Sequence, residues 1–173
     1  MGRVLEVCLS PFVLYPNAML AKKAVAAPVD GRLIAIGERL REAAATAKAY
    51  GLAAAHIGEI EPIMVLNVTP EAPEPSYTLY FNPRVTAAAD ETEAGGEASV
   101  SLPGVEVEIV RPVWTDIAYD DADGVPQSIR FDGFVARCAL HEIEQIEGRF
   151  FLNNLSRLKR DMALKKAAKR RPG

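Results

Sequence analysis

Residues 105–131 constrain the fold most strongly, because their pattern predicts strands that pair with antiparallel neighbours. Over 105–109, apolar residues alternate with acidic ones, as they do in a strand with one buried face. Two further apolar runs, 113–119 and 128–131, flank the sequence DDADG at 120–124, which is typical of a tight hairpin turn. We therefore expect an antiparallel sheet in this part of the chain.

The first half of the chain predicts a helix and two more strands. Apolar side chains recur at helical spacing over 33–47, with Asp30 as a candidate N-cap and Gly51 near the expected exit. Short apolar runs at 62–68 and 77–81 are separated by residues rich in Pro and Glu. We expect two strands around a loop there.

The second half predicts a turn, a helix and a basic tail. The Ala-, acid- and Gly-rich stretch 87–96 predicts an exposed turn, and 134–147 predicts a helix that Gly148 closes. A final amphipathic helix follows, with a basic tail at about 159–173. Because helices and strands do not alternate regularly as βαβ units, we expect one α+β domain over 1–173.

Composition excludes several classes of partner. The formal net charge is −3, so we expect no sequence-specific nucleic-acid binding and no membrane partner. No apolar run approaches the roughly 18 residues of a membrane span. Cys8 and Cys138 lack metal or redox spacing, and Pro11 and Pro16 interrupt the first apolar stretch. We expect a soluble cytoplasmic protein without a secretory leader, with both thiols reduced.

Like charges cluster near the end of the chain, in KKAAKRR at 165–171. Such a cluster is either the solvated face of a helix or a docking patch for an acidic partner. The sequence leaves both interpretations open.

Candidate chemistry lies in the second predicted helix, which contains HEIEQ at 141–145. In an HExxH segment, two histidines four residues apart hold a metal ion on one helix face while the Glu acts as general base. Gln145 occupies the fifth position here, so only His141 of the pair is present. Alone, a His-Glu dipeptide on a helix is weak evidence for a metal site.

Three segments together resemble the signature motifs of peptide deformylases in order and spacing. They are GLAAAHI at 51–57, EASVSLPG at 97–104 and HEIEQ at 141–145, where the family motifs usually read GLAAxQ, EGCLSxPG and HExDH. Three shorter segments extend the likeness: FNP at 81–83, Arg111, and LSRLK at 155–159. The resemblance implies an α+β fold with antiparallel sheets around a central buried helix, followed by a C-terminal helix.

The family activity that this resemblance implies is metal-dependent hydrolysis of the formyl group from N-formylmethionyl peptides. In the family, the Cys of the second motif and both His of the third hold Fe²⁺, Zn²⁺ or Ni²⁺. The Glu of the third motif is the general base. Position by position, His141 matches a metal ligand and Glu142 matches that base.

The other matched positions depart from the family pattern. Ser99 and Gln145 fall where the remaining two metal ligands belong. His56 stands where the family has the Gln that stabilises the oxyanion, and Val100 follows the position of the Cys, where the backbone helps that Gln. The resemblance also places a peptide groove at Gly51, Leu52, Ala53 and Glu97, and a structural salt bridge between Glu97 and Arg111.

These departures predict a weak metal site. A thiolate and two neutral imidazoles bind a borderline metal strongly, whereas a serine hydroxyl and a Gln amide are poor ligands. We expect no cofactor or a weakly bound divalent metal, and without the ion Glu142 has no activated water. The sequence therefore predicts a catalytically impaired homologue, a pseudoenzyme that binds a nascent peptide N-terminus or the ribosome.

Two alternatives remain open. An active amide hydrolase could use a rearranged metal site at His56, His141 and Glu142, with Cys138 as a distant fourth ligand. Otherwise Cys138 is a small core residue and His56 hydrogen-bonds to a neighbour: Ser99, Glu142 or Gln145. In a further reading the groove is vestigial and only the surface, including the basic tail, contacts a partner.

Overall fold

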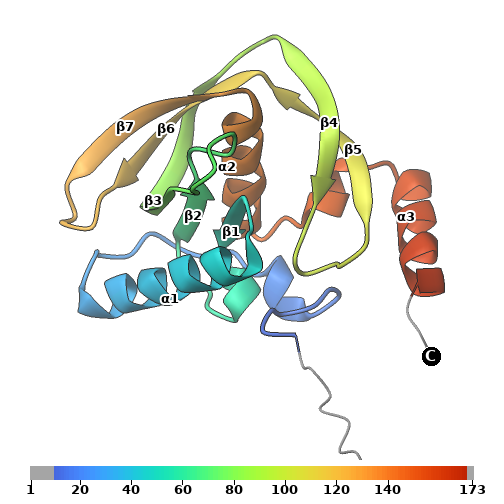
Figure 1. The fold of residues 1–173 in the computed structure, drawn as a ribbon, viewed down its shortest axis with the longest axis horizontal. Coiled ribbons are helices and arrows are strands. Elements are labelled where there is room, and N and C mark those ends of the chain that lie inside the picture. Colours follow the sequence, from blue (N-terminus) through green and yellow to red (C-terminus); the bar gives the residue numbers. More distant parts are fainter. Residues whose placement is uncertain (1–9, 171–173) are drawn as a thin grey trace, which may run out of the picture.

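The computed structural model describes residues 10–170, which form two antiparallel sheets and three α-helices (Figure 1). Five strands pair in the order β1-β2-β3-β6-β7, and β4 pairs with β5 in a separate sheet. The strands are β1 (Gly51–Ala53), β2 (Ile63–Asn67), β3 (Tyr77–Ala88), β4 (Thr92–Ala98), β5 (Glu106–Pro112), β6 (Trp114–Asp120) and β7 (Pro126–Asp132). The helices are α1 (Gly31–Ala47), α2 (Gly133–Ile146) and α3 (Arg157–Arg170), with short 3₁₀ turns η1 (Ala18–Ala21), η2 (Ala54–Ile57) and η3 (Phe151–Asn154).

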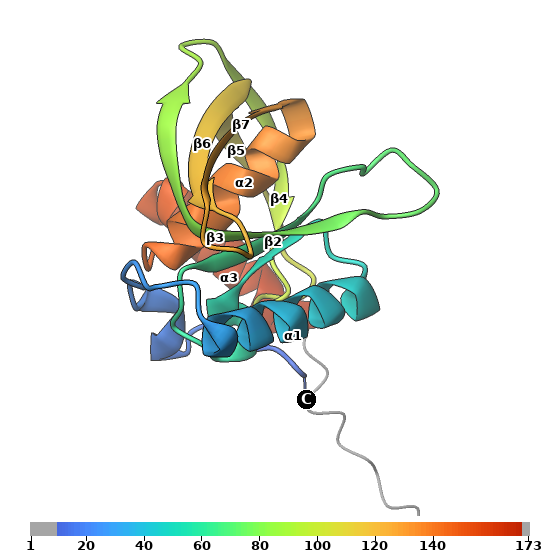
Figure 2. The ribbon, with the colours of Figure 1, turned by 90° about the vertical axis from the view of Figure 1, so that its left-hand side faces the viewer.

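Helices cover both faces of the larger sheet. Figure 2 shows α2 and α1 on opposite sides of β2 and β3. Successive side chains of a strand point to opposite faces, so Met64 and Leu66 pack with α2 while Ile63 and Val65 pack with α1. All four are fully buried, which explains why the sequence of β2 is continuously apolar.

The small sheet encloses α2 from its other side. In Figure 1, α2 stands between the larger sheet and the β4-β5 ribbon. Ile109 of β5 packs with Phe151 of η3 and Ala163 of α3 in a separate buried cluster. The structure confirms antiparallel sheets around a central helix, and residues 77–131 supply strands to both sheets rather than to one.

Local signals in the sequence set most helix ends. Asp30 caps α1 by accepting a hydrogen bond of 2.9 Å from the backbone N–H of Leu33, as expected. α1 ends at Ala47 and Lys48 follows in the left-handed conformation, so Gly51, expected near the exit, lies just beyond it and begins β1. Gly148 has a φ of +81°, which confirms it as the left-handed residue that follows α2.

The expected turn within 87–96 is mostly exposed but is shorter than predicted. β3 continues to Ala88 and β4 begins at Thr92, so only three residues connect them. Two glycines in β4 leave space for side chains from elsewhere in the fold. A Cβ on Gly95 would lie 2.8 Å from the guanidinium carbon of Arg137, and one on Gly96 would lie 2.8 Å from Glu106. Tertiary contacts therefore favour glycine here despite its poor strand propensity.

The expected C-terminal helix is confirmed as α3, which ends at Arg170, and the rest of the basic tail lies outside the described residues. The hairpin around Asp121–Gly124 also forms as expected between β6 and β7. No helix in residues 10–170 combines the length and apolar character needed to cross a membrane. Cys8 lies outside the described part of the chain.

Candidate functional site

A cavity of about 340 Å³ lies between β1, β4 and α2. Its walls are mainly apolar, and polar side chains gather where α2 faces β4. Most of the predicted site residues line it: Gly51, Leu52, His56, Glu97, Ser99, Val100, His141 and Glu142. The three motif segments therefore converge, as the resemblance requires.

Two predicted site residues do not line the cavity. Ala53 is fully buried in the core between β1 and α2. Gln145 is also buried, and its side-chain Nε2 donates to the backbone carbonyl of Leu20 over 2.8 Å. Gln145 thus holds η1 against α2 instead of facing the cavity.

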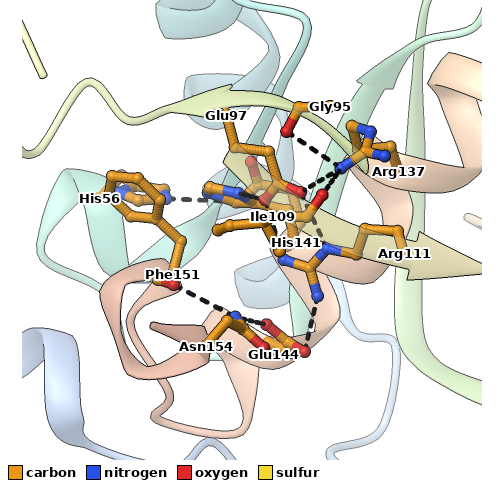
Figure 3. A network of polar contacts seen from close by, with 11 residues as sticks. His56, Gly95, Glu97, Ile109, Arg111, Arg137, His141, Glu144, Phe151 and Asn154 are labelled. Carbon is orange, nitrogen blue, oxygen red and sulfur yellow. Dashed lines mark hydrogen bonds and ion pairs between the residues drawn. The ribbon is translucent and has the colours of Figure 1, made fainter. Parts of the chain in front are cut away.

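Glu97 of β4 is the centre of the polar network (Figure 3). Its carboxylate accepts two hydrogen bonds from Arg111 on β5, at 2.8 and 2.9 Å, which confirms the expected salt bridge. It also accepts from Arg137 at 3.0 Å and from Nδ1 of His141 at 2.8 Å. Glu144 of α2 binds the remaining face of Arg111 at 2.7 Å, so β4, β5 and α2 are joined through these charges.

Burial and ion pairing oppose each other at Glu97. Burial alone would raise the pKa of this carboxyl, but hydrogen bonds from Arg111 and His141 outweigh it and lower the pKa to about 2. Burial likewise opposes the charge of Arg111, whereas Glu97 and Glu144 raise the pKa of its guanidinium above the ordinary value. The network is therefore charged and fully paired at neutral pH.

Glu142 forms a second polar chain beside the first. His56 Nε2 lies 3.3 Å from Glu142 Oε2, and since a carboxylate only accepts, this nitrogen carries the shared proton. Nδ1 of the same ring lies 2.8 Å from the hydroxyl of Ser101, which is fully buried. The prediction that His56 bonds to a neighbour holds for Glu142, and the second partner is Ser101.

His141 and Glu142 stabilise each other's charge. Burial disfavours the cationic form of His141, but Glu142 and the hydrogen bond to Glu97 outweigh it and raise the pKa of the imidazole. Burial also disfavours the Glu142 carboxylate, while His141, His56 and the backbone N–H of Ala53 lower its pKa. The end of the cavity thus presents a carboxylate next to an imidazole.

The donor atoms do not suit a divalent metal. Both ring nitrogens of His56 are occupied by hydrogen bonds, and the hydroxyl of Ser99 accepts from the backbone N–H of Ser101 at 3.1 Å. Gln145 is turned to Leu20. Within residues 10–170, no three His, Cys, Asp or Glu side chains converge as ligands of one ion, and every buried side-chain N or O has a partner. Of the matched ligand positions, His141 alone offers a ring nitrogen, Nε2, since its Nδ1 is held by Glu97, and one imidazole does not make a tight site for a cation.

Comparisons with known proteins show to which family the chain belongs. Residues 9–161 match the family model described as polypeptide deformylase. The chain is 37% identical over 166 residues to a peptide deformylase-like protein of Agrobacterium fabrum, covering 94% of this chain and 98% of that protein. The chain belongs to the peptide deformylase family.

Enzymes and solved structures of that family are also similar. A peptide deformylase of Agrobacterium fabrum is 30% identical over 162 residues, covering 93% of this chain and 95% of that protein. The crystal structure of the peptide deformylase from Ehrlichia chaffeensis in complex with actinonin has a TM-score of 0.85 at 29% identity, covering 94% and 97% of the two chains. The deformylase fold expected from the motifs is therefore confirmed.

Two residues that organise this deformylase-family site were missed from the sequence. Arg137 donates to Glu97 and to the backbone carbonyls of Glu93 and Ile109, at 2.8 and 2.7 Å, and so fixes α2 to both strands of the small sheet. Its spacing of four from His141 on one helix face was a usable signal. Ser101 coincides with the Ser of the second family motif, so its position carried a signal, although its partner histidine lies 45 residues away.

Cys138 lines the cavity and is only partly exposed. Burial and the nearby carboxylates raise the pKa of its thiol to about 12, so it is not a reactive thiolate. Its packing against the core beside α2 fits the expectation of a small apolar residue better than that of a ligand.

Proposed function

We propose that this deformylase homologue binds the N-terminal end of an extended peptide and does not hydrolyse it through a metal-bound water. The cavity carries the proposal, because it combines apolar walls, a polar end and two available strand edges. A binding module needs these features, whereas the family's hydrolysis also needs a held metal ion.

The strand edges favour a peptide over a compact ligand. Among the described strands, β1 is an edge strand of the larger sheet and β4 has β5 as its one neighbour. Both strands line the cavity, β1 through Gly51 and Leu52 and β4 through Gly96 and Ala98. An extended chain that enters between them can add backbone hydrogen bonds to either edge, as peptides do when they join a sheet.

Catalytic impairment is supported by the hydrogen bonds of the donor groups. The family hydrolysis requires an ion to lower the pKa of water, and Ser99 and Gln145 offer neither a thiolate nor an imidazole. The competing hypothesis of an active amide hydrolase requires His56 as a ligand, and that side chain is held between Ser101 and Glu142. No contact in residues 10–170 favours the rearranged site.

The C-terminal helix supports a second contact surface within the same proposal. Leu158 and Met162 of α3 are 70% and 61% exposed, while Ala163 is buried against the small sheet. Basic side chains continue the exposed face beyond them, and we name three of these the α3 lysines: Lys165, Lys166 and Lys169. An acidic assembly such as the ribosome would bring this face to an emerging peptide N-terminus.

The proposal is tested by peptide binding in the presence of a chelator. Fluorescence anisotropy would follow formyl-Met-Ala-Ser and Met-Ala-Ser, each extended by a labelled lysine, with EDTA and without it. We expect saturable binding that EDTA does not change, and no formate release from the formyl peptide. Saturable binding must also depend on the cavity rather than on the outer surface.

A pair of variants supplies that control. Val100→Arg places a long cation in the cavity and should abolish binding. Val110→Arg makes the same change at a position of β5 that is 62% exposed and outside the cavity, and should leave binding intact. Failure of both peptides to bind, or formate release that EDTA abolishes, would overturn the proposal.

A further inference from the structure

The cavity ends at a carboxylate that has no cationic side chain of the usual kind beside it. Glu97 is paired with Arg111 and Arg137, and Glu144 is paired with Arg111. Among residues 10–170, Glu142 forms no ion pair with an Arg or Lys, and the groups that stabilise its charge are the imidazoles of His141 and His56 and the backbone N–H of Ala53. It is the one carboxylate of the buried network without a guanidinium partner.

Gly51 lies directly beside this buried carboxylate, and both residues line the cavity. A Cβ on Gly51 would lie 3.2 Å from Cγ and 3.3 Å from Oε1 of Glu142. A side chain at position 51 would therefore crowd the carboxylate of Glu142. His56 contacts Oε2, which leaves Oε1 toward the side of β1.

Apolar groups surround this position on the route from the surface. Leu52 and Val100 line the cavity, and Tyr50 and Phe134 stack edge to face at a centroid distance of 4.8 Å on its lining. The other charged groups on the lining are Glu97, which pairs with Arg137 and His141, and the exposed Glu106. A ligand for this site is therefore apolar along its length and positive at its inner end.

We infer that the cavity selects a free, unformylated peptide N-terminus, with the α-ammonium on Glu142 and an apolar first side chain against Leu52 and Val100. This inference rests on the proposed function, since it names the peptide that the proposed binding module takes. A formyl or acetyl group removes the positive charge and adds a carbonyl oxygen. That oxygen would approach the Glu142 carboxylate, which has no Arg or Lys partner, and two acceptor oxygens would face each other without a proton between them. A free ammonium instead donates charge-assisted hydrogen bonds to the same oxygen.

The test compares three peptides on the intact protein with EDTA present, by isothermal titration calorimetry at neutral pH. They are Met-Ala-Ser, formyl-Met-Ala-Ser, and the desamino analogue that lacks the amino group without adding bulk. An α-amino group has a pKa of about 8, so the first peptide is mainly cationic. We expect it to bind at least about tenfold more tightly than either of the others, as expected for a charge-assisted contact in a buried site.

A charge-neutral variant assigns the preference to one side chain. Glu142→Gln should bind all three peptides with similar affinity, because the apolar walls remain. Glu147→Gln makes the same change just after α2, at an exposed position paired with Arg149, and should keep the preference.

The outcomes separate this inference from the proposed function. If none of the peptides binds wild-type protein, the proposed function fails and this inference fails with it. If the formyl or desamino peptide binds as tightly as the amine, peptide binding stands and selection of the ammonium is refuted. A preference that survives in Glu142→Gln would also refute the role of that carboxylate. The wild-type comparison decides the point even if Glu142→Gln does not fold.

Discussion

Replacing Glu97 by Gln should destabilise the protein more than any surface charge change. The carboxylate is 6% exposed and accepts hydrogen bonds from Arg111, Arg137 and His141. Glutamine keeps the shape but loses the charge, and its NH₂ group would meet guanidinium donors. Breaking a buried ion pair from one side costs about 3–5 kcal/mol, because the partner charges remain buried.

The pKa of Glu97 gives an independent magnitude. It lies at about 2 in the folded protein against an ordinary value of 4.5, because hydrogen bonds from Arg111 and His141 outweigh burial. A lowered folded pKa stabilises the native state fully above the unfolded value, and this contribution is lost as the pH falls through about 4.5 toward about 2. A difference of about 2.5 pKa units corresponds to about 3 kcal/mol, which agrees with the loss expected from the mutation.

Urea unfolding followed by far-UV circular dichroism measures both the loss of stability in the variant and the change of that loss with pH. Glu97→Gln should lose about 3 kcal/mol at neutral pH, and the loss should shrink between about pH 4.5 and 2. Asp116→Asn is the matched control, because Asp116 also receives two hydrogen bonds from one arginine, Arg130, on the exposed surface. Solvent screens that pair, so its removal should change stability far less. Equal losses in the two variants would refute the reasoning.

Three further predictions concern the backbone, the metal and the tail. Gly148→Ala should lose at least about 1 kcal/mol more stability than Gly104→Ala in urea, because both have positive φ but a Cβ on Gly148 alone would lie 2.7 Å from a backbone carbonyl oxygen of η1. Ser99→Cys with Gln145→His should gain divalent metal by elemental analysis of the purified protein, whereas formate release should also require His56→Gln, since a lost oxyanion donor costs on the order of 100-fold. A folded double variant that takes up no metal would contradict this. Reversing the charges of the α3 lysines should reduce ribosome co-sedimentation at low salt but not at high salt. Charge reversal leaves Ala163 packed in the core, whereas removal of α3 would also remove that contact.

Several parts of the fold and site could be predicted because they depend on local chemistry. The N-cap at Asp30, the hairpin turn before β7 and the left-handed Gly148 follow from residue types within a few positions of each other. The pairing of Glu97 with Arg111 was predictable from the motif resemblance, since both segments carry a matched position. Convergence of His56, Ser99 and His141 at one cavity followed in the same way.

What the sequence by itself determined, therefore, is the order of helices and turns and the residues that the motifs bring to one site. Only the tertiary structure decided how those residues are used. β4 contains Gly95, a poor strand former, because the guanidinium of Arg137 occupies the space that a side chain at this position would need. The side chain of Gln145 donates a hydrogen bond to the backbone carbonyl of Leu20, 125 residues away, and does not line the cavity. The physical reason is that caps and turns are fixed by neighbouring backbone groups, whereas a buried side chain takes the partner that packing places within hydrogen-bond distance.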